Sequence, residues 1–487
     1  MSTPRIPPPL AGGARGADAL RPLLDIALGA LREGATARGG PLPAGGPEAV
    51  AARVRAAAHP VLPDRGTGPE TALRTLIHAL TEGAADPAEP LCAAHLHCPP
   101  LAVATAADLA ASALNPSMDS WDQAPAATAL EALVTRALAA EIHDGGDALI
   151  TTGGTEANQL ALLLAREAPT ARGPVRLLAG ANAHHSLARA AWLLGLPEPV
   201  IVPAPAGTLD PAALDEALTE LGGPPGTFLV AATAGTTDAG LIDPLDDIAE
   251  LCAAHGARLH VDAAYGGGLL FSDTRKGQLT GIDRADTVAL DLHKLGWQPA
   301  AAGLLAVRDP RDLDALNHRA DYLNADDDTD AGLPDLLGRS LRTTRRPDVL
   351  KVAVTLKALG RTGLGRLVDQ VCDQAREFAE LIDAHPAFEL YDTPAISTVL
   401  FRPAGATDHH IARVRRRLLT EGTAVLGRAD LDGRRWLKAT LLNPHTRPGD
   451  LAGLLKLVEE PERALEEPPA ASTTAATAAR TEGTTPR

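Results

Sequence analysis

Lysine and aromatic residues are scarce in this chain of 487 residues, which has six lysines and 2% aromatic residues. With so few lysines, the position of each can be considered in turn. Long apolar runs are also lacking, since none reaches the ~18 residues that suggest a membrane-spanning helix. The N-terminal stretch lacks the apolar core of a secretory signal. We therefore expect a cytoplasmic protein with no membrane role.

Paired cysteines and clustered basic residues are absent as well. None of the four cysteines, Cys92, Cys98, Cys252 and Cys372, belongs to a CxxC pair, so we expect small apolar side chains in a reducing compartment. The formal net charge of −16 disfavours nucleic acid as a partner. The segment "HLHC" at 95–98 offers potential metal ligands, but no second cluster follows at zinc-finger spacing. We expect no metal site.

Composition and periodicity divide the chain into five parts. Pro, Gly and Ala dominate residues 1–18, and large apolar residues are rare in 461–487, so both ends are expected to be disordered. Helical periodicity predicts an N-terminal helical segment over 19–100. Strand-like runs near 175 and at 227–233, 258–264, 287–293 and 303–309 alternate with helical patterns. This alternation predicts a large α/β domain at 101–340 with a mainly parallel sheet and flanking helices, and a small α+β domain follows at 341–460.

Three segments of the large domain carry residues suited to chemistry. "ITTGGTEAN" combines a strand, a glycine turn and a helix start, so Gly154 and Thr155 are candidates for binding a phosphate. Asp262 ends an apolar strand, and Lys294 follows "TVALDLH" at what we expect to be the same sheet edge, where ligands of open α/β sheets bind. Alternatively, Thr155 is a simple helix cap and Asp262 a turn residue.

Lys294 differs from the other five lysines. We expect those five to be solvated at the surface, the usual state of lysine: Lys276, Lys351, Lys357, Lys438 and Lys456. A phosphate-binding turn, a buried aspartate and a strand-end lysine together meet the needs of pyridoxal 5'-phosphate: a phosphate anchor, a partner for the ring nitrogen and an amine for a Schiff base.

The chain resembles the group II pyridoxal-phosphate decarboxylases of fold type I. The resemblance covers about residues 60–455 and rests on segments in the same order, among them "TTGGTEANQLAL", "NAHHSLARAAWLLG", "HVDAAYGG", "LDLHKLGWQP" and "SLRTTRRPDVLK". "LLNPHT" and the region around "NPSMDSWDQ" resemble the bacterial L-2,4-diaminobutyrate branch and the lysine and ornithine decarboxylases of siderophore pathways. The resemblance implies a homodimer with pyridoxal 5'-phosphate.

The resemblance also implies how the cofactor is held. Gly154 and Thr155 would bind the phosphate with help from His293. Lys294 would form the Schiff base, and Asp262 would pair with the ring nitrogen.

Further residues are assigned by the same resemblance. Ala264 and His184 would lie against the two faces of the ring. Thr233 and Asp243 would lie near the cofactor and the substrate carboxylate. Tyr322, in "ADYLN", matches the tyrosine that returns a proton to Cα after carbon dioxide leaves.

The implied activity is decarboxylation of an L-amino acid to its amine, with a dibasic substrate first: 2,4-diaminobutyrate, ornithine or lysine. Aromatic and branched aliphatic amino acids are the alternatives, and departures from the family pattern at Pro116, Ala124 and Pro347 bear on this choice. A transaminase or aldehyde-forming relative is a further alternative, which Phe in place of Tyr322 would favour. A protein that keeps the fold without catalysis is another.

Overall fold

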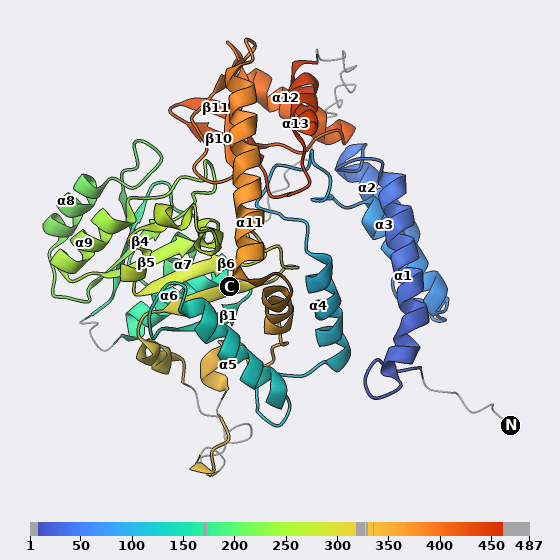
Figure 1. Cartoon of the computed structure of the whole chain (residues 1–487), viewed down its shortest axis with the longest axis horizontal. Coiled ribbons are helices and arrows are strands. Elements are labelled where there is room, and N and C mark those ends of the chain that lie inside the picture. The colour runs from blue at the N-terminus through green and yellow to red at the C-terminus, as the bar shows by residue number, and fades with distance from the viewer. Residues whose placement is uncertain (1–7, 169–172, 318–326, 328–329, 335, 461–487) are drawn as a thin grey trace, which may run out of the picture.

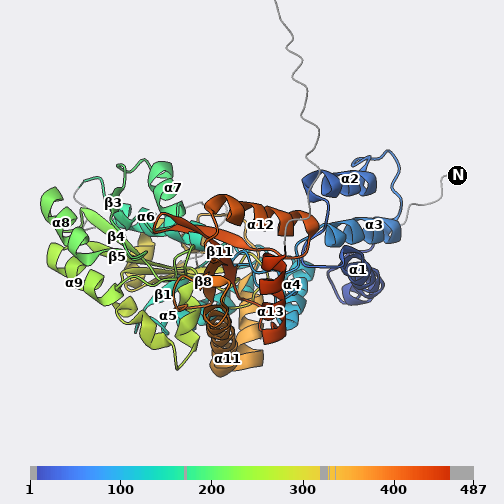
Figure 2. The ribbon, with the colours of Figure 1, turned by 90° about the horizontal axis from the view of Figure 1, so that it is seen from above.

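The computed structural model describes residues 8–168, 173–317, 327, 330–334 and 336–460. Its first three helices, α1 (Gly16–Arg38), α2 (Gly46–Ala58) and α3 (Pro69–Glu82), lie together at one side of the molecule (Figure 1). From above, α8 (Pro211–Leu221) and α9 (Leu245–His255) lie at the opposite end (Figure 2). Helix α1 begins inside the stretch 1–18 for which we expected disorder, while 1–7 and 461–487 lie outside the described residues.

A seven-stranded sheet with the order β1-β7-β6-β5-β4-β2-β3 forms the centre of the large domain. Its strands are β1 (Asp147–Thr151), β2 (Arg176–Gly180), β3 (Val200–Val202), β4 (Phe228–Thr233), β5 (Arg258–Ala263), β6 (Thr287–Asp291) and β7 (Gly303–Val307). Six strands run in one direction, and β7 runs antiparallel to its neighbours β1 and β6. The prediction of a mainly parallel sheet is confirmed.

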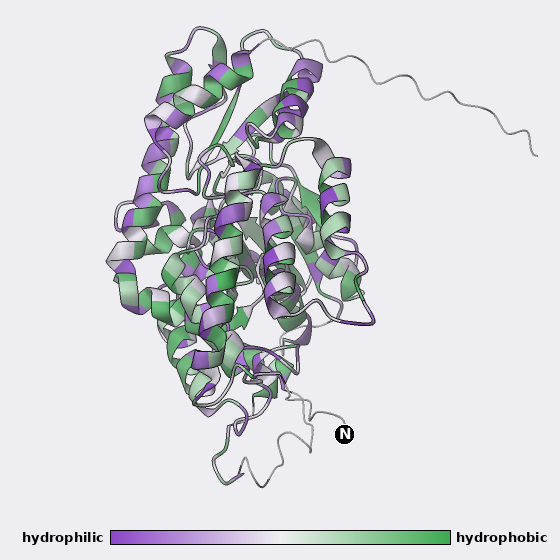
Figure 3. Cartoon of the chain, turned by 90° about the vertical axis from the view of Figure 1, so that its right-hand side faces the viewer, coloured by the Kyte–Doolittle hydropathy of each residue, from purple (hydrophilic) through white to green (hydrophobic). Residues whose placement is uncertain are grey.

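Both faces of this sheet are covered by helices. In β4, Val230 and Ala232 join the core under α5 (Pro125–Ala139), α8, α9 and α11 (Val349–Asp383). Leu229 and Ala231 pack on the other face against α6 (Gly154–Glu167) and α7 (Ser186–Leu193). Hydrophilic and hydrophobic residues alternate along the helices in Figure 3, as expected of helices with one buried face. A polar side chain on a central strand is therefore buried and needs a hydrogen-bond partner.

The small domain follows α11, the helix that leads upward in Figure 1. Its antiparallel sheet has the order β10-β11-β9-β8, with β8 (Phe388–Leu390), β9 (Thr398–Pro403), β10 (Gly427–Leu431) and β11 (Arg434–Thr440). Helices α12 (Asp408–Glu421) and α13 (Pro448–Glu459) pack on it around Phe378, Phe401 and Leu437. Within α11, Gly360 has φ 64° and interrupts the helix. The α+β prediction is confirmed.

One helix, α4 (Ala102–Leu114), connects the N-terminal helices to the large domain and packs on α11. Short 3₁₀ segments follow β5 and β7: Gly266–Phe271, Lys276–Leu279, Ile282–Arg284, Pro310–Leu316 and Leu337–Arg339. Across the described part of the chain, no helix is both long and apolar enough to cross a membrane. The four cysteines are free thiols, and three of them are buried, in agreement with their expected role as small core side chains.

Candidate active site

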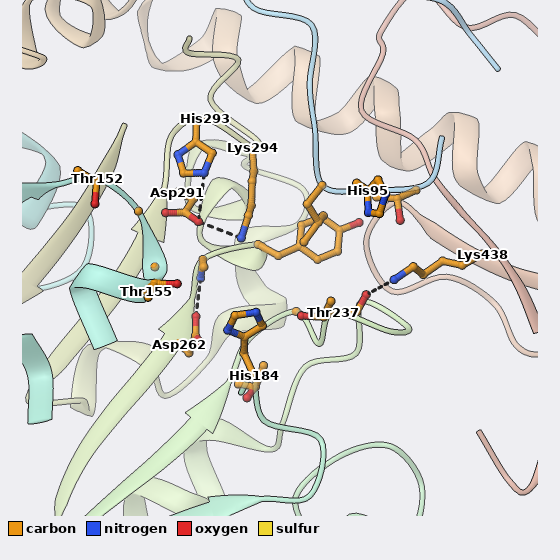
Figure 4. A pocket seen from close by; sticks show the side chains of 18 residues that line it. His95, Thr152, Thr155, His184, Thr237, Asp262, Asp291, His293, Lys294 and Lys438 are labelled. Carbon is orange, nitrogen blue, oxygen red and sulfur yellow. Dashed lines mark hydrogen bonds and ion pairs between the residues drawn. The ribbon is translucent and has the colours of Figure 1, made fainter. Parts of the chain in front are cut away.

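A cavity of about 370 Å³ opens at the carboxyl ends of the parallel strands. Its inner part is formed by residues at and just after the ends of β1, β4, β5 and β6, together with the first turn of α6. Its outer part is formed by His95, from the segment before α4, and by Lys438 and Thr440 of β11. The close-up in Figure 4 shows these side chains around one space. Residues distant in the sequence thus meet at one sheet edge.

The glycine turn after β1 lies against the other inner residues. Gly153 has φ 146°, and a Cβ atom there would lie 2.9 Å from Cε1 of His293. A Cβ atom on Gly154 would lie 2.9 Å from the Cβ of Ala264. Only glycine fits at both positions without a shift of the neighbours, so the backbone at the start of α6 borders the cavity where side chains would otherwise stand. Thr155 adds a hydroxyl in the same turn.

Lys294 lies beside a buried carboxylate that the sequence analysis did not identify. Its Nζ is 2.9 Å from Oδ2 of Asp291, the last residue of β6. His293 approaches the same oxygen at 3.6 Å through Nε2, while its Nδ1 lies 2.9 Å from the carbonyl oxygen of Ala302. The other oxygen, Oδ1 of Asp291, is buried with no hydrogen-bond partner among the described residues. Asp291 therefore holds the lysine amine through Oδ2, while its Oδ1 remains available as an acceptor.

Asp262 is fixed by two donors. Its Oδ2 accepts a hydrogen bond from Nδ2 of Asn158 at 2.8 Å, and its Oδ1 accepts one from the Ala264 backbone N–H at 3.1 Å. Thr233, at the end of β4, also lines the cavity, and its hydroxyl is buried without a partner among the described residues. His184 lines the same space, and burial lowers its pKa, opposed by the charge of Asp262.

Most of the residues chosen from the sequence meet in this cavity. Eight of them line it: Gly154, Thr155, His184, Thr233, Asp262, Ala264, His293 and Lys294. Asp243 does not line it. Its carboxylate accepts hydrogen bonds from Asn182 Nδ2 and from the backbone N–H groups of Leu209 and Thr233, and burial raises its pKa. Asp243 thus supports the end of β4 from behind. Tyr322 lies outside the described residues.

Two lysines expected at the surface are buried, so that expectation was wrong for them. Lys351 is 1% exposed because its ammonium lies between Asp108 at 3.3 Å and Asp348 at 3.5 Å, a pairing of α4 with α11. Lys438 is 8% exposed and lines the cavity, donating a hydrogen bond to the carbonyl oxygen of Thr237 at 2.9 Å. Burial lowers the pKa of Lys438, and Asp238, 3.8 Å away, opposes this effect.

Some of these residues could have been found from the sequence. Asp291 stands three positions before Lys294, a spacing that brings two side chains together in a tight turn. Lys438 belongs to the other domain, and only tertiary structure brings it to the cavity. For metals, the described residues contain no group of three or more His, Cys, Asp or Glu side chains that could hold an ion.

The inner cavity fits a flat heteroaromatic ring that carries a phosphate. The backbone at Gly153 and Gly154 leaves room where a side chain would stand, and the free hydroxyl of Thr233 and free oxygen of Asp291 are polar groups that a ligand can satisfy. Pyridoxal 5'-phosphate meets these features, with an aldehyde for Lys294 and a ring nitrogen for Asp262.

Known proteins share this fold and much of the sequence. The pyridoxal-dependent decarboxylase conserved domain matches residues 73–404. The L-2,4-diaminobutyrate decarboxylase of Rhizobium meliloti (strain 1021) is 41% identical over 83% of this chain and 84% of its own length. That of Acinetobacter baumannii is 32% identical over 82% and 85%.

A solved structure is similar over almost the whole chain. It is the glutamate decarboxylase domain of a diaminobutyrate-pyruvate transaminase and L-2,4-diaminobutyrate decarboxylase from Vibrio parahaemolyticus. It superimposes with a TM-score of 0.81 at 32% identity, covering 92% of this chain and 96% of that one.

Proposed function

The chain belongs to the pyridoxal-dependent decarboxylase family, and from this premise we propose that its substrate is a dibasic L-amino acid, first of all 2,4-diaminobutyrate, with ornithine and lysine next. The observation that carries the chemistry is a single cavity containing the Lys294–Asp291 pair, Asp262 and the glycine turn. The names of the two diaminobutyrate decarboxylases support the substrate.

Pyridoxal 5'-phosphate, when bound, supplies an aldehyde that condenses with amines and a ring that accepts the electron pair released when the Cα–carboxylate bond breaks. Lys294 would bind the aldehyde through its amine, which Asp291 orients at 2.9 Å. Asp262 would pair with the ring nitrogen and favour its protonated form, because its carboxylate is held in place by two hydrogen-bond donors.

The remaining residues hold the cofactor and the substrate. The phosphate would be bound by the N–H groups around Gly154, the hydroxyl of Thr155 and the ring of His293. His184 and Ala264, which both line the cavity, would lie against the two faces of the ring. Thr233, whose hydroxyl has no partner among the described residues, would contact the cofactor.

Lys438 binds a substrate carboxylate. It is a buried cation in the outer cavity, and its described contacts are one carbonyl oxygen and a carboxylate 3.8 Å away, so it can accept a further anionic partner. In a dibasic substrate that anion is the α-carboxylate, which is neutralised until it leaves as carbon dioxide.

Tyr322 returns a proton to Cα once the carboxylate has left. The protein has two other tyrosines. Tyr265 is buried, with its hydroxyl bonded to Ser397 and Thr398, and Tyr391 bonds to Asp432 in the small domain. The role of Tyr322 rests on the match of "ADYLN" to the family's proton-returning tyrosine.

The functional unit is a homodimer in the cytoplasm. Trp192 and Leu193, at the end of the helix that follows His184, are 76% and 57% exposed in the single chain, as expected if a second copy covers them. The free cysteines support a reducing compartment. Light scattering of the purified protein at about the mass of two chains tests the dimer, and the mass of a single chain would contradict it.

A substrate screen tests the proposed activity. The protein, loaded with pyridoxal 5'-phosphate, is incubated with 2,4-diaminobutyrate, ornithine, lysine, an aromatic, a branched aliphatic and an acidic L-amino acid, and amine and carbon dioxide are measured. We expect the highest kcat/KM for 2,4-diaminobutyrate. Preference for glutamate or aspartate would indicate that Lys438 binds the side-chain carboxylate of the substrate. Preference for an aromatic or aliphatic substrate would overturn the dibasic proposal. Keto acid formation without carbon dioxide would indicate a transaminase.

A further inference from the structure

A row of buried polar side chains lies beneath Asp262, outside the cavity. Asn158 on α6, Ser186 at the start of α7, His260 on β5 and Thr287 on β6 are each at most 2% exposed. His260 stands two residues before Asp262 in the same strand, so the two side chains leave the sheet on the same face, toward α6. An apolar side chain would suffice to fill this space between sheet and helix, so the polar row requires another explanation.

Asn158 is the centre of this row. Its Nδ2 lies 2.8 Å from Oδ2 of Asp262 and 2.9 Å from Oγ of Ser186, so each amide hydrogen has an acceptor. Its Oδ1 lies 2.9 Å from Nε2 of His260. The opposite orientation of the amide would turn its oxygen toward the carboxylate. Asn158 therefore donates two hydrogen bonds toward the active site, and its amide oxygen needs a donor on the side away from the cavity.

His260 is the group that donates this bond. Burial lowers its pKa to about 4, so the ring is neutral near pH 7 and carries one proton. Since Nε2 faces the amide oxygen of Asn158, that proton lies on Nε2. Nδ1 is then an acceptor, and the hydroxyl of Thr287, 2.9 Å away, donates to it. Both nitrogens of this ring therefore have a hydrogen-bond partner.

The second branch runs from Asn158 to the residue proposed to lie against the cofactor ring. Because the Oγ of Ser186 accepts from Asn158, its own hydrogen is free to donate to Nδ1 of His184, which lies 2.7 Å away. Nδ1 of His184 is then an acceptor, so the proton of its neutral ring lies on Nε2. The positions of the protons on His184 and around Asp262 thus depend on one histidine that touches neither the cavity nor a ligand.

We propose that His260 is a positioning residue for the cofactor: through Asn158 it directs one N–H onto Asp262 and, through Ser186, sets the proton position of His184. The proposal rests on the role of Asp262 toward the ring nitrogen given above. Without the donor from His260, Oδ1 of Asn158 is buried and unpaired, and the amide rotates away or recruits water, which loosens the donor on Asp262.

The variants His260→Leu and His260→Gln test this inference. Leucine fills the space without a donor, whereas the glutamine amide can again donate to Asn158. A matched control is His143→Leu, which removes another histidine of the large domain, 2% exposed and away from the cavity. Each apoprotein is titrated with pyridoxal 5'-phosphate, and the absorbance of the bound cofactor is followed against pH.

We expect His260→Leu to weaken cofactor binding roughly tenfold and to shift the pH midpoint of the absorbance change, because a hydrogen bond to a charged group is lost. His260→Gln should stay within about threefold of wild type, and His143→Leu should leave both readings unchanged. If His260→Leu fails to fold, Thr287→Val, which removes only the hydroxyl that holds Nδ1, should shift both readings in the same direction by less. Values for His260→Leu or Thr287→Val equal to those of the control would overturn the proposal.

The variant Asp262→Asn separates this inference from the function it rests on. If His260 acts through Asp262, adding His260→Leu to Asp262→Asn should weaken cofactor binding no further, whereas a full additional tenfold loss would show that the histidine acts elsewhere. If Asp262→Asn alone keeps normal turnover and cofactor affinity, the role of Asp262 itself fails. If Asp262→Asn is impaired while His260→Leu matches the control, only the inference about His260 fails.

Discussion

The inner and outer parts of the cavity are held in different ways. In the inner part, Asp262 has two hydrogen-bond donors, and the turn at Gly153 packs against His293. In the outer part, Lys438 has one carbonyl oxygen as a close partner, with Asp238 at 3.8 Å. The inner part comes from one sheet edge of the large domain, whereas the outer part combines β11 with the segment before α4.

The difference separates chemistry from substrate choice. A rigid inner part suits a cofactor that must be held in one orientation throughout the reaction. In the outer part, few hydrogen bonds join the residues to one another, so polar groups remain for binding the substrate. A change of one side chain there alters substrate recognition without disturbing the sheet. We therefore expect inner variants to lose turnover and outer variants to lose affinity.

The largest expected effect is that of Lys294→Ala. Removal of the amine that holds the aldehyde should lower kcat by on the order of 10³-fold or more, as for other nucleophile deletions. Lys357→Ala, at an exposed position of α11, is the matched control and should keep full activity. Carbon dioxide release measures both, and appreciable turnover by Lys294→Ala would contradict the assignment.

Tyr322→Phe tests the step that follows bond cleavage. Carbon dioxide should still form, but protonation of Cα should slow by roughly 10²-fold, the scale of general acid catalysis. The unprotonated carbon then reacts with oxygen, giving aldehyde and ammonia in place of amine. Products are compared in air and under nitrogen, and an unchanged amine yield and rate would remove Tyr322 from the mechanism.

Lys438→Met tests the outer part. Loss of the cation should raise KM for the substrate by roughly tenfold with a smaller change in kcat, because a charge-assisted hydrogen bond is lost. Lys438→Arg keeps the charge and should retain most of the affinity. Cofactor affinity should be normal in both variants, and a fall in kcat at constant KM would assign Lys438 to the inner part.

A further effect, on stability rather than activity, depends on pH. The pKa of His260 is about 4 in the folded protein, against an ordinary 6.5, because the ring is buried. Between these values the unfolded chain binds a proton that the folded protein does not, so the free energy of unfolding falls as pH drops, by about 3 kcal/mol from this residue. His260→Gln should remove that part of the slope between pH 6.5 and 4. If the free energies of unfolding of wild type and His260→Gln, measured in urea, changed with pH in parallel, they would contradict this prediction.

The sequence predicted the inner part far better than the outer part. Asp262 lies near the end of β5, and Gly154 and Lys294 come soon after β1 and β6 of the same sheet, so the order of strands and helices is enough to bring them to one edge. His260 could also have been identified from the sequence, since residues two apart in a strand share a face and His260 lies two positions before Asp262. Lys438 could not, because its approach to Thr237 depends on how the two domains pack.

The fold shows the same division. The long apolar strands were predictable because both their faces are buried. β3 (three residues), β8 and β10 were missed, since they are short or carry charges and are held by pairing with neighbours. Asp243 does not line the cavity; its carboxylate accepts hydrogen bonds from Asn182 Nδ2 and from the backbone N–H groups of Leu209 and Thr233.

The most direct test of the account is to identify the lysine that carries the cofactor. The purified protein with pyridoxal 5'-phosphate is reduced with borohydride, digested, and the labelled peptide is sequenced by mass spectrometry. We predict that one peptide is labelled and that the label is on Lys294, because its amine lies in the inner cavity beside Asp291. Label on Lys438, the other lysine lining the cavity among the described residues, would contradict the account.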